Sequence, residues 1–593
     1  MVAQKFAPFG GMIPAFDDTL LPNTAAARAE NTWLFDGSLR GMFTAKLLHT
    51  CADVTAARAF RLPNNYTDRI HIEDAIWLEF LNADTDVIRS TVVGDQWDRY
   101  YWASTSDVPR YNTRDRIKTG DPAYKLGVPN PDVAPVVVAS GGTSTVVESR
   151  AYVYTWVSAY GEEGPPSPPT VLNGKKDDTW GLTLVAAAAS DLGVDRVLTK
   201  TRIYRTVTGS DGTATYFLVD EIPIGQLTYN DTKADTVVSV SSSLESTTWT
   251  GPPSDLQGWV TMPNGMVAGF RDKEVWFCEP YRMHAWPAQY TLVVDFPIVG
   301  LGVQGTSLVV CTRGSPYLMY GADPTNLTQV RLPNIEPCMS RGSIVSRAEG
   351  VYYASPNGLM CVTYGSVTNI TRQAIPKDKW QQLMPAATLY AAQLGDSYYG
   401  FGSARFGVFD TDAFDTSSFA QYDFSQAYVG ALQAADASVA LSVLTSDLPV
   451  ACVWNDAFTG ELFIMKEGKV YWLDVSDEQQ PHDVFLWRSK LFQTDKSQNL
   501  GAMKVFFDVP AGNPPQNAER NTDPVQTLDE GQYGIIRIYA DGRLITTREL
   551  RVSGELMRIE SGFKADWWQV EIEGRVIVKN VQLASSAREL GVV

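Results

Sequence analysis

The sequence predicts an all-β protein that combines a β-propeller, an inserted β-sandwich and a C-terminal β-sandwich or barrel. Short runs rich in Val, Tyr, Phe, Trp and Thr recur along the 593 residues, and 46 Gly and 33 Pro supply turns between them. Branched and aromatic side chains suit a pleated, half-buried surface. A hairpin pattern also repeats at a fixed interval. Helical patterns are confined to residues 24–31 and 377–384, and each is expected to form at most a short helix because neither sustains an apolar face.

The N-terminal region, residues 1–130, is assigned to an arm followed by the first propeller strands. Residues 1–22 mix Gly and Pro with apolar anchors, a pattern too irregular for a strand alone. Downstream, residues 76–80 and 87–91 are expected to be the two strands of one hairpin. We expect this hairpin to supply part of a blade, so that the N-terminal region closes the ring and removes open strand edges.

Residues 131–254 form a different module, which opens after a Pro-rich linker at residues 128–135. Its first strand alternates Tyr152, Tyr154 and Trp156, which places three aromatic side chains on one face of the strand. A Gly-Glu-Glu-Gly turn followed by prolines ends that strand. The module resembles a fibronectin type III domain, and we expect a sandwich inserted into the propeller at a blade edge.

Residues 255–480 contain the repeats. Val267, Val309 and Val351 recur at an interval of 42 residues (309 − 267 and 351 − 309), each within a strand, a four-residue turn and a second strand. Two looser copies follow at residues 398–410 and 462–474. Hairpins at such a period are typical of propeller blades, and each must bury its apolar face on the next. The WD dipeptide is missing from the repeats; the alternative is a large β-sandwich with accidental periodicity.

Residues 481–593 break this period and are assigned to a C-terminal β-sandwich or barrel. Residues 540–543, Ala-Asp-Gly-Arg, have the composition of a hairpin turn. Residues 510–531 are polar and rich in Pro and Asn, which predicts a long connecting loop. Six runs are expected to be strands: residues 484–492, 503–509, 535–540, 544–550, 567–572 and 576–583.

Charge and composition exclude several classes of protein. The chain has 49 Lys and Arg against 67 Asp and Glu, a formal net charge of −18, which argues against a protein that grips nucleic-acid phosphates. No apolar run approaches the roughly 20 residues that span a bilayer, and the first residues lack the apolar core of a secretory signal. Six sparse Cys without C-x-x-C spacing indicate reduced structural thiols in a cytoplasmic setting. We therefore expect a soluble chain that folds without export.

The residue patterns assign no catalytic, cofactor-binding or metal-binding residue. H-E-x-x-H, G-x-S-x-G and Walker-type motifs are missing, and the four His are far apart in the sequence. Residues 210–216 partly match a sialidase Asp box, but the motif occurs once and ordinary turn chemistry explains it. Aromatic residues, including Trp567 and Trp568, are expected to fill cores. Several carboxylates also occupy turn-like positions without a sign that two of them converge: Asp84, Asp86, Asp95, Asp98, Asp410 and Asp412. We predict that the protein is not an enzyme and takes no cofactor.

Segments from both ends of the chain carry a resemblance to a known family. The first begins Phe9-Gly-Gly-Met-Ile-Pro-Ala-Phe-Asp-Asp and continues to Arg40. The next are Asp84-Thr-Asp-Val-Ile-Arg-Ser-Thr, Arg99-Tyr-Tyr-Trp and Asp107-Val-Pro-Arg-Tyr, and the last is Phe485-Leu-Trp-Arg-Ser-Lys. With the sandwich and hairpins between them in this order, they resemble the tail nozzle (tail hub) proteins of short-tailed, podovirus-type bacteriophages.

This resemblance implies a structural component of the virion tail that assembles in the host cytoplasm. Six copies would form a ring at the distal end of the tail, below the adaptor (head-to-tail connector) that docks on the portal. The ring would enclose the exit channel, through which viral DNA passes without sequence-specific binding. Further implied partners are tail fibre or spike proteins and, during ejection, the host cell envelope. The family has no catalytic residues to carry over.

The N-terminal arm is the candidate assembly interface. We expect Phe6, Phe9, Ile13 and Phe16 to pack on a neighbouring subunit or on the adaptor. Deletion of residues 1–20 should then abolish assembly and leave the monomer folded. The loop at residues 510–531 is a second candidate element, which would constrict the channel.

The acidic composition is compatible with a DNA conduit, because a negatively charged channel wall repels DNA and so disfavours its adhesion to the wall. Six copies would carry six times −18, or −108 formal charges. The same acidity would also simply keep a large particle soluble. The alternative function is a propeller-based host glycan-binding protein or glycosidase, whose paired carboxylates would cleave sugars. A cytosolic propeller scaffold is a third interpretation, but it does not account for the N-terminal resemblance.

Overall fold

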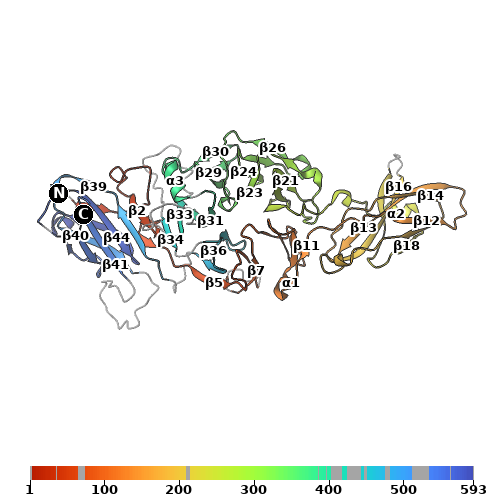
Figure 1. The fold of residues 1–593 in the computed structure, drawn as a ribbon, viewed down its shortest axis with the longest axis horizontal. Coiled ribbons are helices and arrows are strands. Elements are labelled where there is room, and N and C mark those ends of the chain that lie inside the picture. Colours follow the sequence, from red (N-terminus) through yellow and green to blue (C-terminus); the bar gives the residue numbers. More distant parts are fainter. Residues whose placement is uncertain are drawn as a thin grey trace. The chain divides into compact units, whose positions relative to one another are not determined.

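The computed structural model describes residues 3–34, 36–64, 72, 74–208, 214–384, 386–394, 397–401, 417–423, 443–446, 450–473, 481–509, 533–560 and 562–591. Within them almost every regular element is a β-strand, which confirms the all-β class. The α-helices of the described residues are short: α1 (Arg114–Thr119), α2 (Asp235–Val238) and α3 (Lys377–Leu383) (Figure 1). None of the helices in these ranges is long and apolar enough to cross a membrane.

The chain divides into two compact units, which are described separately. One comprises Asp84–Ile335, and the other comprises Met1–Ala83 together with Glu336–Val593.

The unit Asp84–Ile335 contains three four-stranded antiparallel sheets whose strands pair in chain order. The first has β8 (Asp86–Arg89), β9 (Arg99–Ala103), β10 (Arg110–Thr113) and β11 (Tyr124–Lys125). The second has β19 (Gln257–Thr261), β20 (Val267–Arg271), β21 (Glu274–Phe277) and β22 (Leu292–Val293). The third has β23 (Ile298–Gln304), β24 (Ser307–Thr312), β25 (Tyr317–Tyr320) and β26 (Thr328–Arg331).

The apolar faces of these three sheets pack in succession. Trp259 of β19 stacks on Trp286 with ring centroids 5.7 Å apart, in a core that also contains Tyr101 of β9. Phe270 of β20 and Leu308 of β24 share the next core. Each sheet therefore buries its face on its neighbour, as stacked units that cannot stand alone must do.

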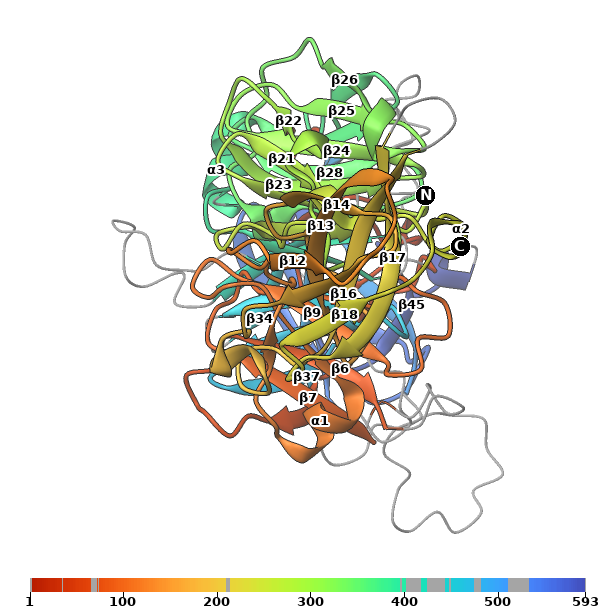
Figure 2. The ribbon, with the colours of Figure 1, turned by 90° about the vertical axis from the view of Figure 1, so that its right-hand side faces the viewer.

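The same unit contains the inserted sandwich, most of whose strands are labelled in Figures 1 and 2. One sheet has β12 (Val136–Ser140), β15 (Thr179–Thr183) and β18 (Thr228–Asp231). The other has β14 (Thr170–Lys175), β13 (Val147–Ser158), β16 (Leu198–Thr208) and β17 (Ala214–Pro223). Tyr152, Tyr154 and Trp156 of β13 share one core with Trp180 and Leu182 of β15, so the two sheets face each other.

The unit formed by both ends of the chain contains further sheets of the same kind. One is β27 (Val345–Ser346), β28 (Val351–Ser355), β29 (Gly358–Thr363) and β30 (Ser366–Asn369). Another is β35 (Cys452–Asn455), β36 (Leu462–Lys466) and β37 (Lys469–Trp472), completed by β5 (Lys46–Thr50) from the N-terminal region. Two shorter sheets pair β6 (Arg58–Pro63) with β7 (Ala75–Phe80) and β3 (Thr32–Trp33) with β4 (Arg40–Gly41).

The C-terminal strands join a ten-stranded sheet and a four-stranded sheet that share one core. The larger sheet runs β31 (Tyr390–Leu394), β32 (Ser397–Phe401), β33 (Ser417–Asp423), β34 (Val443–Ser446), β2 (Ala26–Glu30), β38 (Phe485–Ser489), β44 (Ala565–Gly574), β41 (Gly534–Ala540) and β42 (Arg543–Glu549), and β39 (Phe492–Gln498) also pairs with β44. The smaller runs β1 (Ala3–Phe6), β45 (Ile577–Ala584), β40 (Ala502–Asp508) and β43 (Met557–Arg558).

The 42-residue interval has a structural counterpart. Val267, Val309 and Val351 each lie in the second strand of a four-stranded sheet, and each is 0% exposed. The interval is therefore the distance along the chain from one sheet to the next. Closure of these sheets into a propeller ring stays a prediction.

The predicted turn at residues 540–543 is confirmed. Ala540 pairs with Arg543 across the turn, and Asp541 and Gly542 have φ values of 48° and 76°. Two consecutive residues with positive φ match the twist of the flanking strands, which explains the Asp-Gly pair.

Three local predictions are wrong. Residues 76–80 and 87–91 do not form one hairpin, because β7 pairs with β6 and β8 pairs with β9. Residues 24–31 contain the strand β2 rather than a helix: Ala26 and Ala29 face inward and let β2 approach β38. The run at residues 484–492 is divided between β38 and β39. Strand propensity identifies a strand but not its partner, which packing decides. By contrast, α3 confirms the short helix expected near residue 377.

Candidate functional site

The four residues predicted to form an assembly interface lie in different environments. Phe6 and Phe9 are each 3% exposed within the C-terminal core, and Ile13 is 7% exposed within the core beneath β28 and β29. Phe16 is 48% exposed. Three of the four side chains therefore stabilise this chain itself, and Phe16 is the one that offers apolar surface to a neighbour.

Trp487 of β38 organises the contact between the N-terminal arm and the C-terminal region. Its ring meets Phe9 edge-on at a centroid distance of 5.0 Å, and its Nε1–H donates to the Gly10 carbonyl at 3.0 Å. Nearby, Lys490 Nζ donates to the Leu21 carbonyl at 2.9 Å. The arm is thus part of the folded body. Deletion of residues 1–20 is expected to unfold this core, contrary to the expectation that the monomer stays folded.

Among the described residues, the carboxylates considered for catalysis make hydrogen bonds and ion pairs that stabilise the local fold. Asp86 accepts a hydrogen bond from the Trp259 N–H at 3.0 Å, and Asp95 pairs with Arg99 Nε at 2.8 Å. Asp410, Asp412, residues 210–213 of the Asp-box-like motif, His71 and the loop at residues 510–531 lie outside the described residues. Trp568 is 0% exposed, in agreement with a core role.

Two of the described histidines are interior residues. Burial lowers the pKa of His284 to about 3, because a charged imidazolium is poorly solvated inside the protein. Burial also lowers the pKa of His482, whose Nδ1 lies 2.7 Å from the Gly41 carbonyl oxygen. Neither has the half-exposed setting of a proton-transfer residue.

The third, His49, belongs to a group that combines three metal-ligating chemistries. His49 lies in β5, Cys51 directly follows β5, and Glu79 lies in β7. One imidazole nitrogen, the thiol sulfur and one carboxylate oxygen lie within 4.8 Å of one another. His49 Nε2 is 2.8 Å from Glu79 Oε1. This is the candidate site of the described chain, and it is a candidate metal centre.

The surroundings orient these three side chains. The second carboxylate oxygen of Glu79 accepts the Ala52 N–H at 2.9 Å. The His49 ring stacks on Trp77 with centroids 5.0 Å apart and an interplanar angle of 9°. Burial, together with the negative charge of Glu79 and Asp53, raises the pKa of the Cys51 thiol to about 11. Without a metal the thiol is therefore protonated at neutral pH.

Two of the three residues of this cluster have a local sequence signal. His49 and Cys51 are two residues apart in a strand-forming run, so both side chains fall on one face. A His-x-Cys pair has neither C-x-x-C spacing nor two neighbouring histidines, the two patterns typical of metal sites. Glu79 comes from a strand of another sheet, and nothing in the sequence joins it to the pair.

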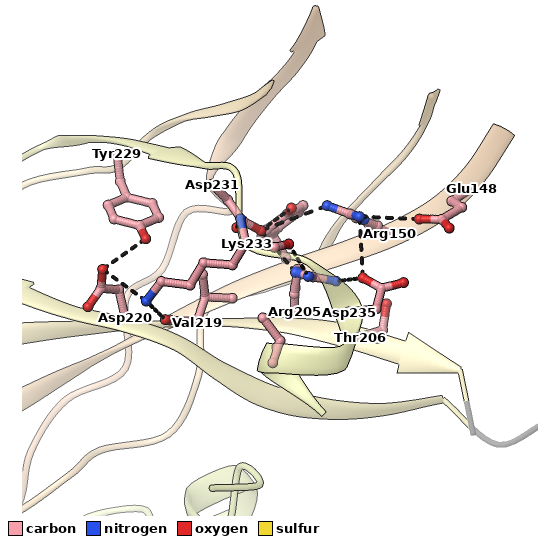
Figure 3. Close-up of polar contacts among 12 residues, drawn as sticks. Glu148, Arg150, Arg205, Thr206, Val219, Asp220, Tyr229, Asp231, Lys233 and Asp235 are labelled. Atoms are coloured by element: carbon pink, nitrogen blue, oxygen red, sulfur yellow. Dashed lines mark hydrogen bonds and ion pairs between the residues drawn. The ribbon is translucent and has the colours of Figure 1, made fainter. Parts of the chain in front are cut away.

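A second polar cluster lies inside the sandwich, between its sheets and α2 (Figure 3). The Arg205 guanidinium lies 2.9 Å from an Asp231 carboxylate oxygen, and both side chains are 0% exposed. Tyr152 donates its hydroxyl hydrogen to Asp231 at 2.7 Å, and Arg150 and Arg205 both pair with Asp235. The fully buried Arg205–Asp231 pair joins β16 of one sheet to β18 of the other, so the cluster helps to hold the two sheets of the sandwich together.

Comparisons with known proteins assign no family to the chain. No family model matches it, and no curated protein matches it. Among solved structures, BBS1N in complex with ARL6DN is similar at a TM-score of 0.24 and 11% identity, over 46% of this chain and 86% of that one. The BT4673 extracellular domain from B. thetaiotaomicron has a TM-score of 0.24 and 14% identity, over 51% and 41% of the two chains. The N-terminal domain of Nup159 has a TM-score of 0.21 and 8% identity, over 59% and 99%. These TM-scores are too low to support an inference about function.

Proposed function

We propose that the protein is a structural component of a short bacteriophage tail: a nozzle subunit of which six copies enclose the DNA exit channel. The proposal rests on the sequence resemblance, and the first and last of the segments that carry it lie in contact in the folded chain. The segment that begins at Phe9 and the segment that begins at Phe485 carry the resemblance although they lie more than 400 residues apart. Phe9, Gly10 and Leu21 from the first contact Trp487 and Lys490 from the second.

The two segments therefore behave as one structural element. Pairing of β2 with β38 adds main-chain hydrogen bonds between the same segments. The net charge of −18 per chain also suits a wall past which DNA must slide.

Exposed Phe16 is the part of the arm that we assign to contact with a neighbouring copy or with the adaptor. It lies between the buried Ile13 and the carboxylate of Asp17, which caps its own turn by accepting the Thr19 N–H at 3.0 Å. A fixed turn presents this aromatic side chain at low entropic cost on binding.

Negative-stain imaging tests the proposal. The purified chain, alone and mixed with adaptor-capped portal particles of the same virus, should give six-fold rings, and Phe16→Ala should reduce ring formation. Leu20→Ala, which removes another exposed apolar side chain of the arm (72% exposed), is the matched control. A chain that stays monomeric in both preparations and instead binds or cleaves a host polysaccharide would favour the glycan-directed alternative.

A further inference from the structure

We propose that His49, Cys51 and Glu79 bind one Zn²⁺ ion, which joins two neighbouring sheets of the unit formed by the chain ends. The inference is independent of the nozzle function. It rests on the convergence of three different donor groups from β5, from the residue after β5 and from β7.

The donor set selects the metal. A thiolate and an imidazole favour zinc over magnesium or calcium, which prefer oxygen ligands. Three protein ligands leave a fourth tetrahedral position for water. The His49 and Glu79 side chains are each 24% exposed, so an ion and its water ligand have access from solvent.

The geometry needs only a small adjustment to accept the ion. With zinc–ligand distances of about 2.0–2.3 Å, donor atoms around a tetrahedral centre lie roughly 3.3–3.7 Å apart. The three donor atoms lie within 4.8 Å of one another, and the His49–Glu79 pair at 2.8 Å would open slightly. The three donor groups come from two different sheets, and the packing of those sheets already brings them together.

Outer contacts support the ligands as they do in known zinc sites. The Ala52 N–H holds the carboxylate oxygen of Glu79 that does not face His49. Stacking on Trp77 fixes the plane of the His49 ring. Such partners orient metal ligands and typically affect metal affinity by about 10–100-fold.

The ion would stabilise a weak part of the fold. Among the described residues the sheet of β6 and β7 has two strands, and a two-stranded hairpin depends on its packing partners for stability. It is tied to the sheet of β35–β37 and β5 by the buried pair of Arg61 and Asp456, whose charged atoms lie 2.7 Å apart. Zinc at His49, Cys51 and Glu79 would strengthen the contact that His49 already makes with Glu79 and Trp77 between the same two sheets.

Binding releases a proton. The Cys51 thiol loses its proton to solvent as the sulfur–zinc bond forms, and His49 binds as the neutral imidazole. No oxidant or reductant takes part.

Cobalt substitution gives the most specific test, because a thiolate bound to Co²⁺ produces a charge-transfer absorption band. The full chain, stripped with a chelator and titrated with CoCl₂, should develop this band at one equivalent, and ZnCl₂ should abolish it. Cys51→Ala should lose the band. Cys278→Ala, which removes another buried thiol, should keep it.

Affinity for Zn²⁺ measured by competition with a chromophoric chelator gives a second readout. His49→Gln and Glu79→Gln should each weaken binding by more than the 10–100-fold typical of outer contacts, with the circular dichroism spectrum unchanged. One equivalent of zinc should also slow hydrogen exchange in β6 and β7 of the unsubstituted chain. A cobalt spectrum without a thiolate band, or one that Cys51→Ala leaves unchanged, would overturn the proposal.

Discussion

Replacement of Asp231 by Asn should destabilise the inserted sandwich strongly. In the wild type, the Asp231 carboxylate faces the Arg205 guanidinium at 2.9 Å with both side chains 0% exposed, and it accepts the Tyr152 hydroxyl at 2.7 Å (Figure 3). Asn keeps the shape and can still accept from Tyr152. It removes the negative charge, so Arg205 retains a buried positive charge compensated only by Asp235, which is 33% exposed.

The expected cost follows from this burial. Breaking a buried ion pair by neutralising one partner typically costs about 3–5 kcal/mol, because the remaining charge is poorly solvated. Asp220→Asn is the matched control in the same sandwich. Its partner Lys233 lies 3.2 Å away, and the two side chains are 41% and 36% exposed. An exposed pair of this kind contributes at most about 1 kcal/mol.

Hydrogen exchange measured by mass spectrometry separates the two cases, because it reports the local opening free energy of β13, β16 and β18 rather than that of the whole chain. A loss of 3–5 kcal/mol corresponds to exchange that is faster by about 100-fold or more. The control should change exchange by less than about tenfold. Equal effects of Asp231→Asn and Asp220→Asn would refute the argument from burial.

Three other predictions concern the core, a turn and pH. Phe9→Ala should lower the stability of the C-terminal core by about 3–5 kcal/mol, whereas exposed Phe16→Ala should change it by less than about 0.5 kcal/mol in thermal melts; similar losses would contradict the assigned burial. Gly468→Ala should lower the free energy of unfolding, measured in urea, by more than Gly542→Ala does. The two glycines have similar positive φ values, +68° and +76°, but a Cβ at 468 would lie 2.8 Å from the Val54 backbone, whereas one at 542 would meet nothing within 4 Å. The pKa of His284 is lowered from 6.5 to about 3, so the unfolded chain binds a proton that the folded chain does not. Wild-type stability should therefore fall by up to about 1.4 kcal/mol per pH unit from pH 6.5 towards 3, and His284→Gln should remove that part of the slope.

Much of the fold was predictable because it depends on local patterns. Branched and aromatic runs marked the strands, Asp541-Gly542 marked a turn that needs two positive φ values, and the spacing of Val267, Val309 and Val351 marked successive sheets. Pairing was harder. β5 completes a sheet with strands more than 400 residues later, and β7 pairs backwards with β6 rather than forwards with β8. These strand pairings depend on which apolar faces pack together in the folded chain, and a short stretch of sequence does not contain that information.

The candidate site was less predictable than the fold. The arm residues Phe6 and Phe9 had the composition of an interface, but the partner that buries them is Trp487 of the same chain. Apolar anchors in an irregular segment do not reveal whether their partner is the same chain or another. The proposed metal site was not predictable, because Glu79 reaches His49 and Cys51 only through the packing of two sheets.

A cryo-electron microscopy map of the tail tip, at a resolution that separates strands, tests the proposed function most directly. The account predicts six symmetry-related copies around a central channel, each with successive four-stranded sheets and with Phe16 against a neighbouring copy or the adaptor. A map that places the chain on a peripheral fibre in another copy number, or that lacks it altogether, would contradict the account.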